Sequence, residues 1–120
     1  MSCWRPGGTA LHTITGDARE ALGGLDPEAA FDVVILDIFS GPEAPAHIAC
    51  TEFYSEVREI LAPSGVLVVN GGDEPGLTLV RSQVAAMRRA MADVAAVAEA
   101  GMFQGRYPGN IVLAGAQTPW

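Results

Sequence analysis

The chain has 120 residues, of which 49% are hydrophobic and 18% are charged. This composition excludes a disordered acidic tail, because such chains lack the apolar surface that offsets the entropy of ordering, and the length predicts one domain over residues 1–120. Seven Lys and Arg against 14 Asp and Glu give a net charge of −7, so we expect no nucleic acid among its partners. The apolar runs are much shorter than the ~20 residues that cross a bilayer, so we expect no membrane-spanning segment.

The two cysteines, Cys3 and Cys50, are too few for a disulfide framework in a domain of this size. Residues 1–8 contain prolyl and glycyl positions and no apolar core, so they predict a loop and do not resemble a secretory signal. Both observations favour a reducing, cytoplasmic location.

The first predicted elements are a strand over residues 9–16, where apolar and hydroxyl side chains alternate loosely, and a short helix over residues 18–22. Asp17 is placed to accept backbone N–H bonds at the start of this helix, and Gly23 and Gly24 end it. Helix capping alone would explain an Asp at this position.

Residues 31–39 form a nearly unbroken apolar and β-branched run, which predicts a central parallel strand covered on both faces. Asp37 lies inside this run. Since a buried, unpaired carboxylate is expensive, we expect Asp37 to be hydrogen-bonded, ion-paired or open to a ligand cleft. Residues 40–47 contain Gly41, Pro42 and Pro45 and predict a loop after the strand.

The rest of the chain continues the alternation of helix and strand. We expect a helix over 51–61, a turn over 63–65, a strand over 66–70 and a glycine-rich turn over 71–76. A helix over 77–91 and two antiparallel closing strands over 94–102 and 110–113 follow. This order is typical of an open α/β sheet with crossover helices. Ligands of such sheets bind outside the carboxyl ends of the strands. Asp17, Asp37, Asn70 and Asp73 lie in or just after the end of a predicted strand, and we expect them near one cleft.

Four segments carry a resemblance to a known family: Gly16-Asp17-Ala18-Arg19-Glu20, residues 31–37, Thr51-Glu52-Phe53-Tyr54 and residues 65–70. In order and spacing, from about residue 9 to 114, they resemble the spermidine synthase family of polyamine aminopropyltransferases. The resemblance implies an α/β fold with a partial Rossmann-like sheet of the class I methyltransferase type and crossover helices.

The resemblance also implies the roles of individual residues. Asp17 would contact the adenine of an adenosyl sulfonium nucleoside, with the Ala18 backbone beside it. Asp37 would face the same nucleoside, begin the catalytic loop, and orient and deprotonate the attacking amine of a polyamine. Ser40 lies in that loop where aminopropyltransferases carry a second Asp, and a hydroxyl does not supply the charge that binds an ammonium group.

The implied donor is decarboxylated S-adenosylmethionine, S-adenosylmethionine or, as a product-like ligand, methylthioadenosine, and no metal is expected. The family's first strand, Gly-rich loop, helix and second strand have no counterpart in this sequence, so we expect the chain to correspond to the carboxyl-terminal part of a larger fold. A free parallel edge promotes association, which predicts a homodimer or a complementing chain.

Two other functions stay open beside an aminopropyltransferase. One is a catalytically inactive fragment or binding subunit that keeps the fold. The other is an S-adenosylmethionine-dependent methyltransferase, since the fold alone does not fix the reaction. His47 in the predicted loop is more simply a solvated side chain than a catalytic one.

Overall fold

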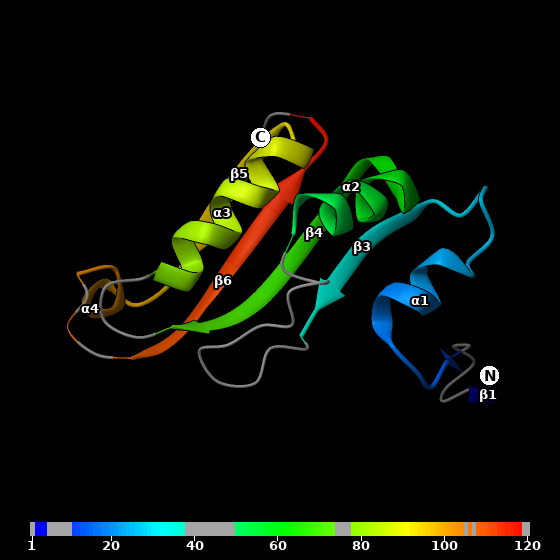
Figure 1. The fold of residues 1–120 in the computed structure, drawn as a ribbon, viewed down its shortest axis with the longest axis horizontal. Helices are drawn as coiled ribbons and strands as arrows, with labels where there is room; N and C mark the ends of the chain where they lie inside the picture. The colour runs from blue at the N-terminus through cyan, green and yellow to red at the C-terminus, as the bar shows by residue number, and fades with distance from the viewer. Residues whose placement is uncertain are drawn as a thin grey trace.

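The computed structural model describes residues 2–4, 11–37, 50–73, 78–104, 106 and 108–118. Its elements are, in chain order, β1 (Ser2–Trp4), β2 (Leu11–Thr13), α1 (Ala18–Gly23), β3 (Phe31–Leu36), α2 (Thr51–Ile60), β4 (Leu61–Asp73), α3 (Thr78–Ala90), β5 (Asp93–Val97), α4 (Ala100–Phe103) and β6 (Gly109–Ala116). Strands β3, β4, β6 and β5 form one sheet in that spatial order, and β1 and β2 form a separate pair (Figure 1). The predicted α/β class with crossover helices is therefore confirmed.

The amino-terminal segment differs from its prediction. Residues 2–4, expected as loop, form β1, which pairs antiparallel with β2, Ser2 lying opposite Thr13. The strand expected over residues 9–16 is only Leu11–Thr13 long and stays outside the main sheet. Gly16 follows it with φ 149°, a conformation that glycine adopts readily because it has no Cβ.

Strand β3 is parallel to β4, as expected, but among the described strands it lies at the edge of the sheet and is not central. Its described part ends at Leu36, before Asp37. Val33 is 55% exposed and Ile35 is 70% exposed. The expectation of cover on both faces is therefore wrong in this structure. An apolar run shows that a strand needs cover, but it does not show which segment supplies it.

Strand β4 is longer than predicted and includes both expected turns where they are described, residues 63–65 and 71–73. Antiparallel pairing with β6 extends it, from Val66 opposite Ala116 to Asp73 opposite Gly109. Gly65 is required for this path, because a Cβ there would lie 2.7 Å from the backbone oxygen of Phe31.

The end of the chain contains two antiparallel strands, as predicted, but with other bounds. The expected strand over 94–102 is divided into β5 and the short helix α4, and β6 extends beyond the expected residues 110–113. Strand β6 lies between β4 and β5, so the last strand of the chain is inserted into the sheet.

The core lies between the sheet and helices α2 and α3, which Figure 1 shows on the same side of the sheet. Leu67 and Leu113 face this side and are almost fully buried. Close packing is visible at Gly115, where a Cβ would lie 3.2 Å from the Cε of Met87 and 3.1 Å from the Cγ of Met91. The two methionines therefore lie directly on the sheet.

Candidate functional site

Asp37 directly follows β3, and its side chain is exposed. The Asn70 Nδ2 donates a hydrogen bond to its Oδ1 at 3.2 Å. The register explains this contact: Leu36 lies opposite Val69 in the parallel pair, so the next residues meet at the carboxyl edge of the sheet. The expected convergence of polar groups is confirmed for this pair, and the carboxylate avoids the cost of burial because water reaches it.

Asp17 is the N-cap of α1. Its Oδ1 accepts backbone N–H bonds from Arg19 at 2.9 Å and from Glu20 at 3.1 Å. This cap satisfies two donors that the first helical turn leaves unpaired. The structural role foreseen for Asp17 is confirmed, and Ala18 follows as the first, half-buried residue of the helix.

Sequence reasoning missed an ion pair that joins α1 to α2. Arg19 donates to Glu56 from Nε at 3.1 Å and from its terminal nitrogen at 2.9 Å, in the two-pronged geometry typical of arginine with carboxylate. The hydrogen bond with Glu56 raises the pKa of Arg19. The two residues are 37 positions apart, and no local pattern connects them.

Cys50 lies beside this ion pair, at the N-cap of α2. An Arg19 guanidinium nitrogen lies 3.8 Å from its Sγ. The pKa of Glu52 is lowered, first by a backbone N–H at the start of the helix and then by the Cys50 thiol. Cys50 also packs against the hydrophobic core.

Several predicted positions lie outside the described residues. Ser40 and His47 are among them, so the predicted catalytic loop stays a prediction. Asp73 is the last residue of β4. Among the described residues, no three His, Cys, Asp or Glu side chains gather closely enough to hold a metal ion, and no helix is long and apolar enough to cross a membrane.

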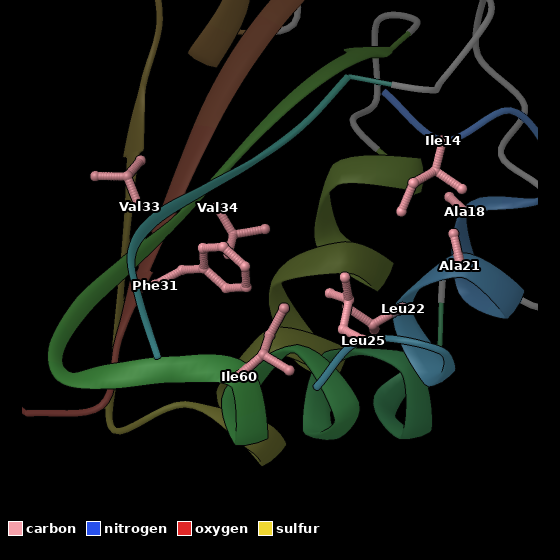
Figure 2. Close-up of a pocket in the computed structure, with 9 residues that line it drawn as sticks. All are labelled: Ile14, Ala18, Ala21, Leu22, Leu25, Phe31, Val33, Val34 and Ile60. Atoms are coloured by element: carbon pink, nitrogen blue, oxygen red, sulfur yellow. The ribbon is translucent and has the colours of Figure 1, made fainter. Parts of the chain in front are cut away.

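An apolar cavity of about 310 Å³ lies between α1 and β3, away from the Asp37–Asn70 pair. Figure 2 shows Phe31 and Val34 directed from β3 toward α1, whose Ala18 and Leu22 line the opposite wall, with Ile60 below them. This cavity offers almost no polar atoms, so it lacks the groups that would recognise a purine or an amine.

Comparison with known proteins connects this arrangement to a family. No protein-family model matches the chain. A polyamine aminopropyltransferase of Vibrio vulnificus (strain CMCP6) is 41% identical over 64 residues, which cover 52% of this chain and 20% of the relative. One of Mycobacterium tuberculosis (strain H37Rv) is 38% identical over 65 residues, which cover 52% of this chain and 12% of the relative.

A solved structure extends the likeness. The crystal structure described as a probable spermidine synthase from Corynebacterium glutamicum matches with a TM-score of 0.81 and 36% identity over 89% of this chain and 38% of that chain. This chain is spermidine synthase-like. The structure of human methyltransferase-like protein 13 in complex with SAH, 22% identical with a TM-score of 0.67, covers 87% of this chain and 48% of that one, and it shows the methyltransferase-type fold alone.

These comparisons confirm the resemblance and the partial methyltransferase-type sheet. The spermidine synthase-like chain spans only 12% to 20% of the curated relatives described above and 38% of the Corynebacterium structure. The activity, substrates and partners of those longer proteins can therefore only be proposed for this chain.

Proposed function

We propose that this chain is a transferase-fold protein that binds an adenosyl sulfonium nucleoside and transfers its aminopropyl group to an amine. The observation that carries the proposal is the exposed Asp37 carboxylate at the carboxyl end of β3, held by the Asn70 amide. The likeness to aminopropyltransferases supports the reaction class. Its donor would be decarboxylated S-adenosylmethionine, with S-adenosylmethionine or methylthioadenosine as related ligands.

The chemistry suits a carboxylate in this position. Asp37 attracts the ammonium form of the acceptor and takes one proton, which frees the nitrogen lone pair. The nitrogen attacks the carbon next to the sulfonium sulfur, a C–N bond forms, the C–S bond breaks, and its electron pair leaves a neutral thioether. The new amine remains a secondary ammonium, and the proton that Asp37 took up then passes to water, which restores the carboxylate. Asn70 orients the carboxylate by bonding one oxygen.

We further propose that Asp17 and the Ala18 backbone hold the adenine. The nucleoside SAH in the structure of methyltransferase-like protein 13 supports an adenosyl ligand for this fold. Asp17 also caps α1, so the same side chain would bind the ligand and stabilise the helix. Ser40 would sit in the acceptor loop without the charge of a second carboxylate, which favours an acceptor other than a strongly cationic polyamine. We also propose a cytoplasmic location, where thiols such as that of Cys50 stay reduced.

A binding subunit without transferase activity is the second candidate. It is favoured by the position of β3 at the edge of the described sheet, since no described strand continues the nucleotide-binding side beyond it. A methyltransferase is a further alternative, supported only by the fold likeness to methyltransferase-like protein 13.

Calorimetry with methylthioadenosine on the full chain tests the nucleoside site. We expect saturable binding that both Asp17→Ala and Asp17→Ser abolish. Ser keeps an N-cap acceptor, so only the Ala variant should also lose about 1 kcal/mol of stability. Binding that Asp17→Ser preserves would remove Asp17 from the adenine site, and no heat at millimolar nucleoside would refute the transferase proposal in favour of the binding subunit.

An aminopropyl-transfer assay with putrescine, and then with less charged amines, tests Asp37. Asp37→Asn keeps an oxygen for the Asn70 bond but cannot take the proton, so we expect at least a 100-fold lower rate with nucleoside binding little changed. Equal rates for the wild type and Asp37→Asn would exclude Asp37 as the base.

A further inference from the structure

The Asp37–Asn70 pair begins a row of residues that crosses the sheet near its carboxyl edge. Asn70 of β4 donates its hydrogen bond to Asp37 and lies opposite Val112 of β6. Val112 in turn lies opposite Val97, the last residue of β5. From β3 to β5, the row therefore consists of a carboxylate, an amide and two valines.

The side chains of this row lie on the face of the sheet that is turned away from α2 and α3. Side chains alternate along a strand, and Val69 and Leu113, which precede Asn70 and follow Val112 in the chain, are buried in the core cluster. Asn70 and Val112 therefore project to the other face. Residues that lie opposite one another across paired strands share a face, so Val97 projects there as well.

The two valines extend the apolar part of the row well beyond the carboxylate. Val112 is 37% exposed and Val97 is 66% exposed, so water reaches both side chains in the described part of the chain. Strands of a sheet lie about 5 Å apart, which places Val112, two strands from Asp37, about 10 Å from it and Val97 about 14 Å from it. A ligand with one charged end at Asp37 thus has an apolar surface beside it, along which a hydrocarbon chain fits.

We propose that Val112 and Val97 form an apolar subsite for the acceptor, and that the acceptor is a primary monoamine with a long alkyl or aryl-alkyl body. This inference rests on the proposed function, in which Asp37 receives the amine. The single ammonium group binds at the carboxylate, and the hydrocarbon body loses its contact with water over the two valines.

The same row disfavours a diamine. The second ammonium group of a diamine would lie over the valines, where it would give up part of its hydration without an opposite charge in return. The row from Asp37 to Val97 contains no second carboxylate. The subsite thus selects acceptors by the apolar character of the part of the molecule that does not react.

Transfer assays on the full chain with octylamine and propylamine as acceptors test this subsite. Both amines carry one ammonium group, and only the octyl chain is long enough to reach the valines. We expect the kcat/KM of the wild type to be at least tenfold higher for octylamine. Val112→Thr and Val97→Thr keep the shape of the side chain but replace a methyl by a hydroxyl group, so each should lower this preference at least fivefold and leave propylamine little changed.

Val33→Thr is the matched control. Val33 lies on the same face and is 55% exposed, but it precedes Asp37 by four residues on β3 and is outside the row. This variant should keep the octylamine preference of the wild type, and circular dichroism checks the fold of all three variants. Equal kcat/KM for the two amines would overturn the proposal, and so would an equal loss in Val33→Thr.

A binding experiment separates this subsite from the transfer reaction. Octylamine is titrated without a nucleoside while the methyl resonances of Val97 and Val112 are followed by NMR. We expect saturable shifts, and Asp37→Asn should weaken the binding at least tenfold. If these shifts occur but no amine is a substrate, the transferase proposal fails and the subsite stands. Transfer to octylamine that Val112→Thr does not affect, or methyl resonances that do not move at millimolar octylamine, would overturn the subsite and leave the transferase proposal in place.

Discussion

The buried pair of Tyr54 on α2 and Gln83 on α3 offers a sharp test of how the two helices are held on the sheet. Tyr54 is fully buried, and its hydroxyl donates a hydrogen bond to Oε1 of Gln83. Within the part of the chain that the structure describes, the Nε2 of Gln83 has no hydrogen-bond partner. The pair therefore contains one satisfied bond and one unsatisfied donor in the core.

Tyr54→Phe removes the hydroxyl and leaves the Gln83 oxygen buried without a donor, which we expect to cost about 1–3 kcal/mol of unfolding free energy. Gln83→Met alone should also destabilise the chain, because the Tyr54 hydroxyl then lacks its acceptor, but less, since the unpaired amide nitrogen disappears as well. The double variant replaces both polar partners by apolar groups and should lie within about 1 kcal/mol of the wild type.

The pH dependence gives this prediction a second readout. Burial raises the pKa of the Tyr54 phenol above its ordinary value. The folded chain therefore keeps a proton that the unfolded chain loses above about pH 10, so this group lowers stability as the pH rises, by about 1.4 kcal/mol for each unit above pH 10. Tyr54→Phe lacks this loss, so its deficit against the wild type should shrink by about 1.4 kcal/mol between pH 8 and pH 11.

Urea unfolding followed by circular dichroism at pH 8 and pH 11 measures both effects on the wild type, the two single variants and the double variant. A Tyr54→Phe variant as stable as the wild type at pH 8, or a deficit that stays constant up to pH 11, would refute the assignment of Tyr54 as a buried, hydrogen-bonded phenol.

Two further predictions concern stability. Gly65→Ala should destabilise the chain by about 1–3 kcal/mol, because the added Cβ would clash with the Phe31 backbone oxygen. The control Gly23→Ala lies at an open helical position and should stabilise the chain by up to about 1 kcal/mol. Equal unfolding midpoints for the two variants would contradict the close approach of β4 to Phe31. Glu56→Gln should lower the free energy of unfolding by less than about 1 kcal/mol, because its ion pair with Arg19 is partly exposed, and this loss should become smaller in 1 M salt. A larger loss of stability in thermal unfolding that does not depend on salt would show that the two side chains act through packing.

Local chemistry in the sequence was enough to predict several features. Asp17 before good helix formers predicted the cap and helix α1, and the pattern of residues 51–61 predicted helix α2. The polar residues near the ends of two predicted strands led to the prediction that Asp37 and Asn70 would lie close together. Each of these features depends on neighbours in the chain or on the general rule that parallel strands align their carboxyl ends.

The ion pair between α1 and α2 could be found only in the tertiary structure. Arg19 and Glu56 are far apart in the chain, and their charges become a two-pronged ion pair only because the helices pack side by side. In the same way, residues 71–73 have the composition of a turn, but antiparallel pairing with β6 holds them in the long strand β4.

The sequence by itself determined which segments of this chain are apolar enough to need cover and which polar residues follow them. Only the tertiary structure decided that β3 lies at an edge, with Ile35 exposed, and that β6 is inserted between β4 and β5. The physical reason is that apolar burial is non-directional: the side chains of a strand fix its need for neighbours, whereas the identity of each neighbour follows from the packing of the whole chain.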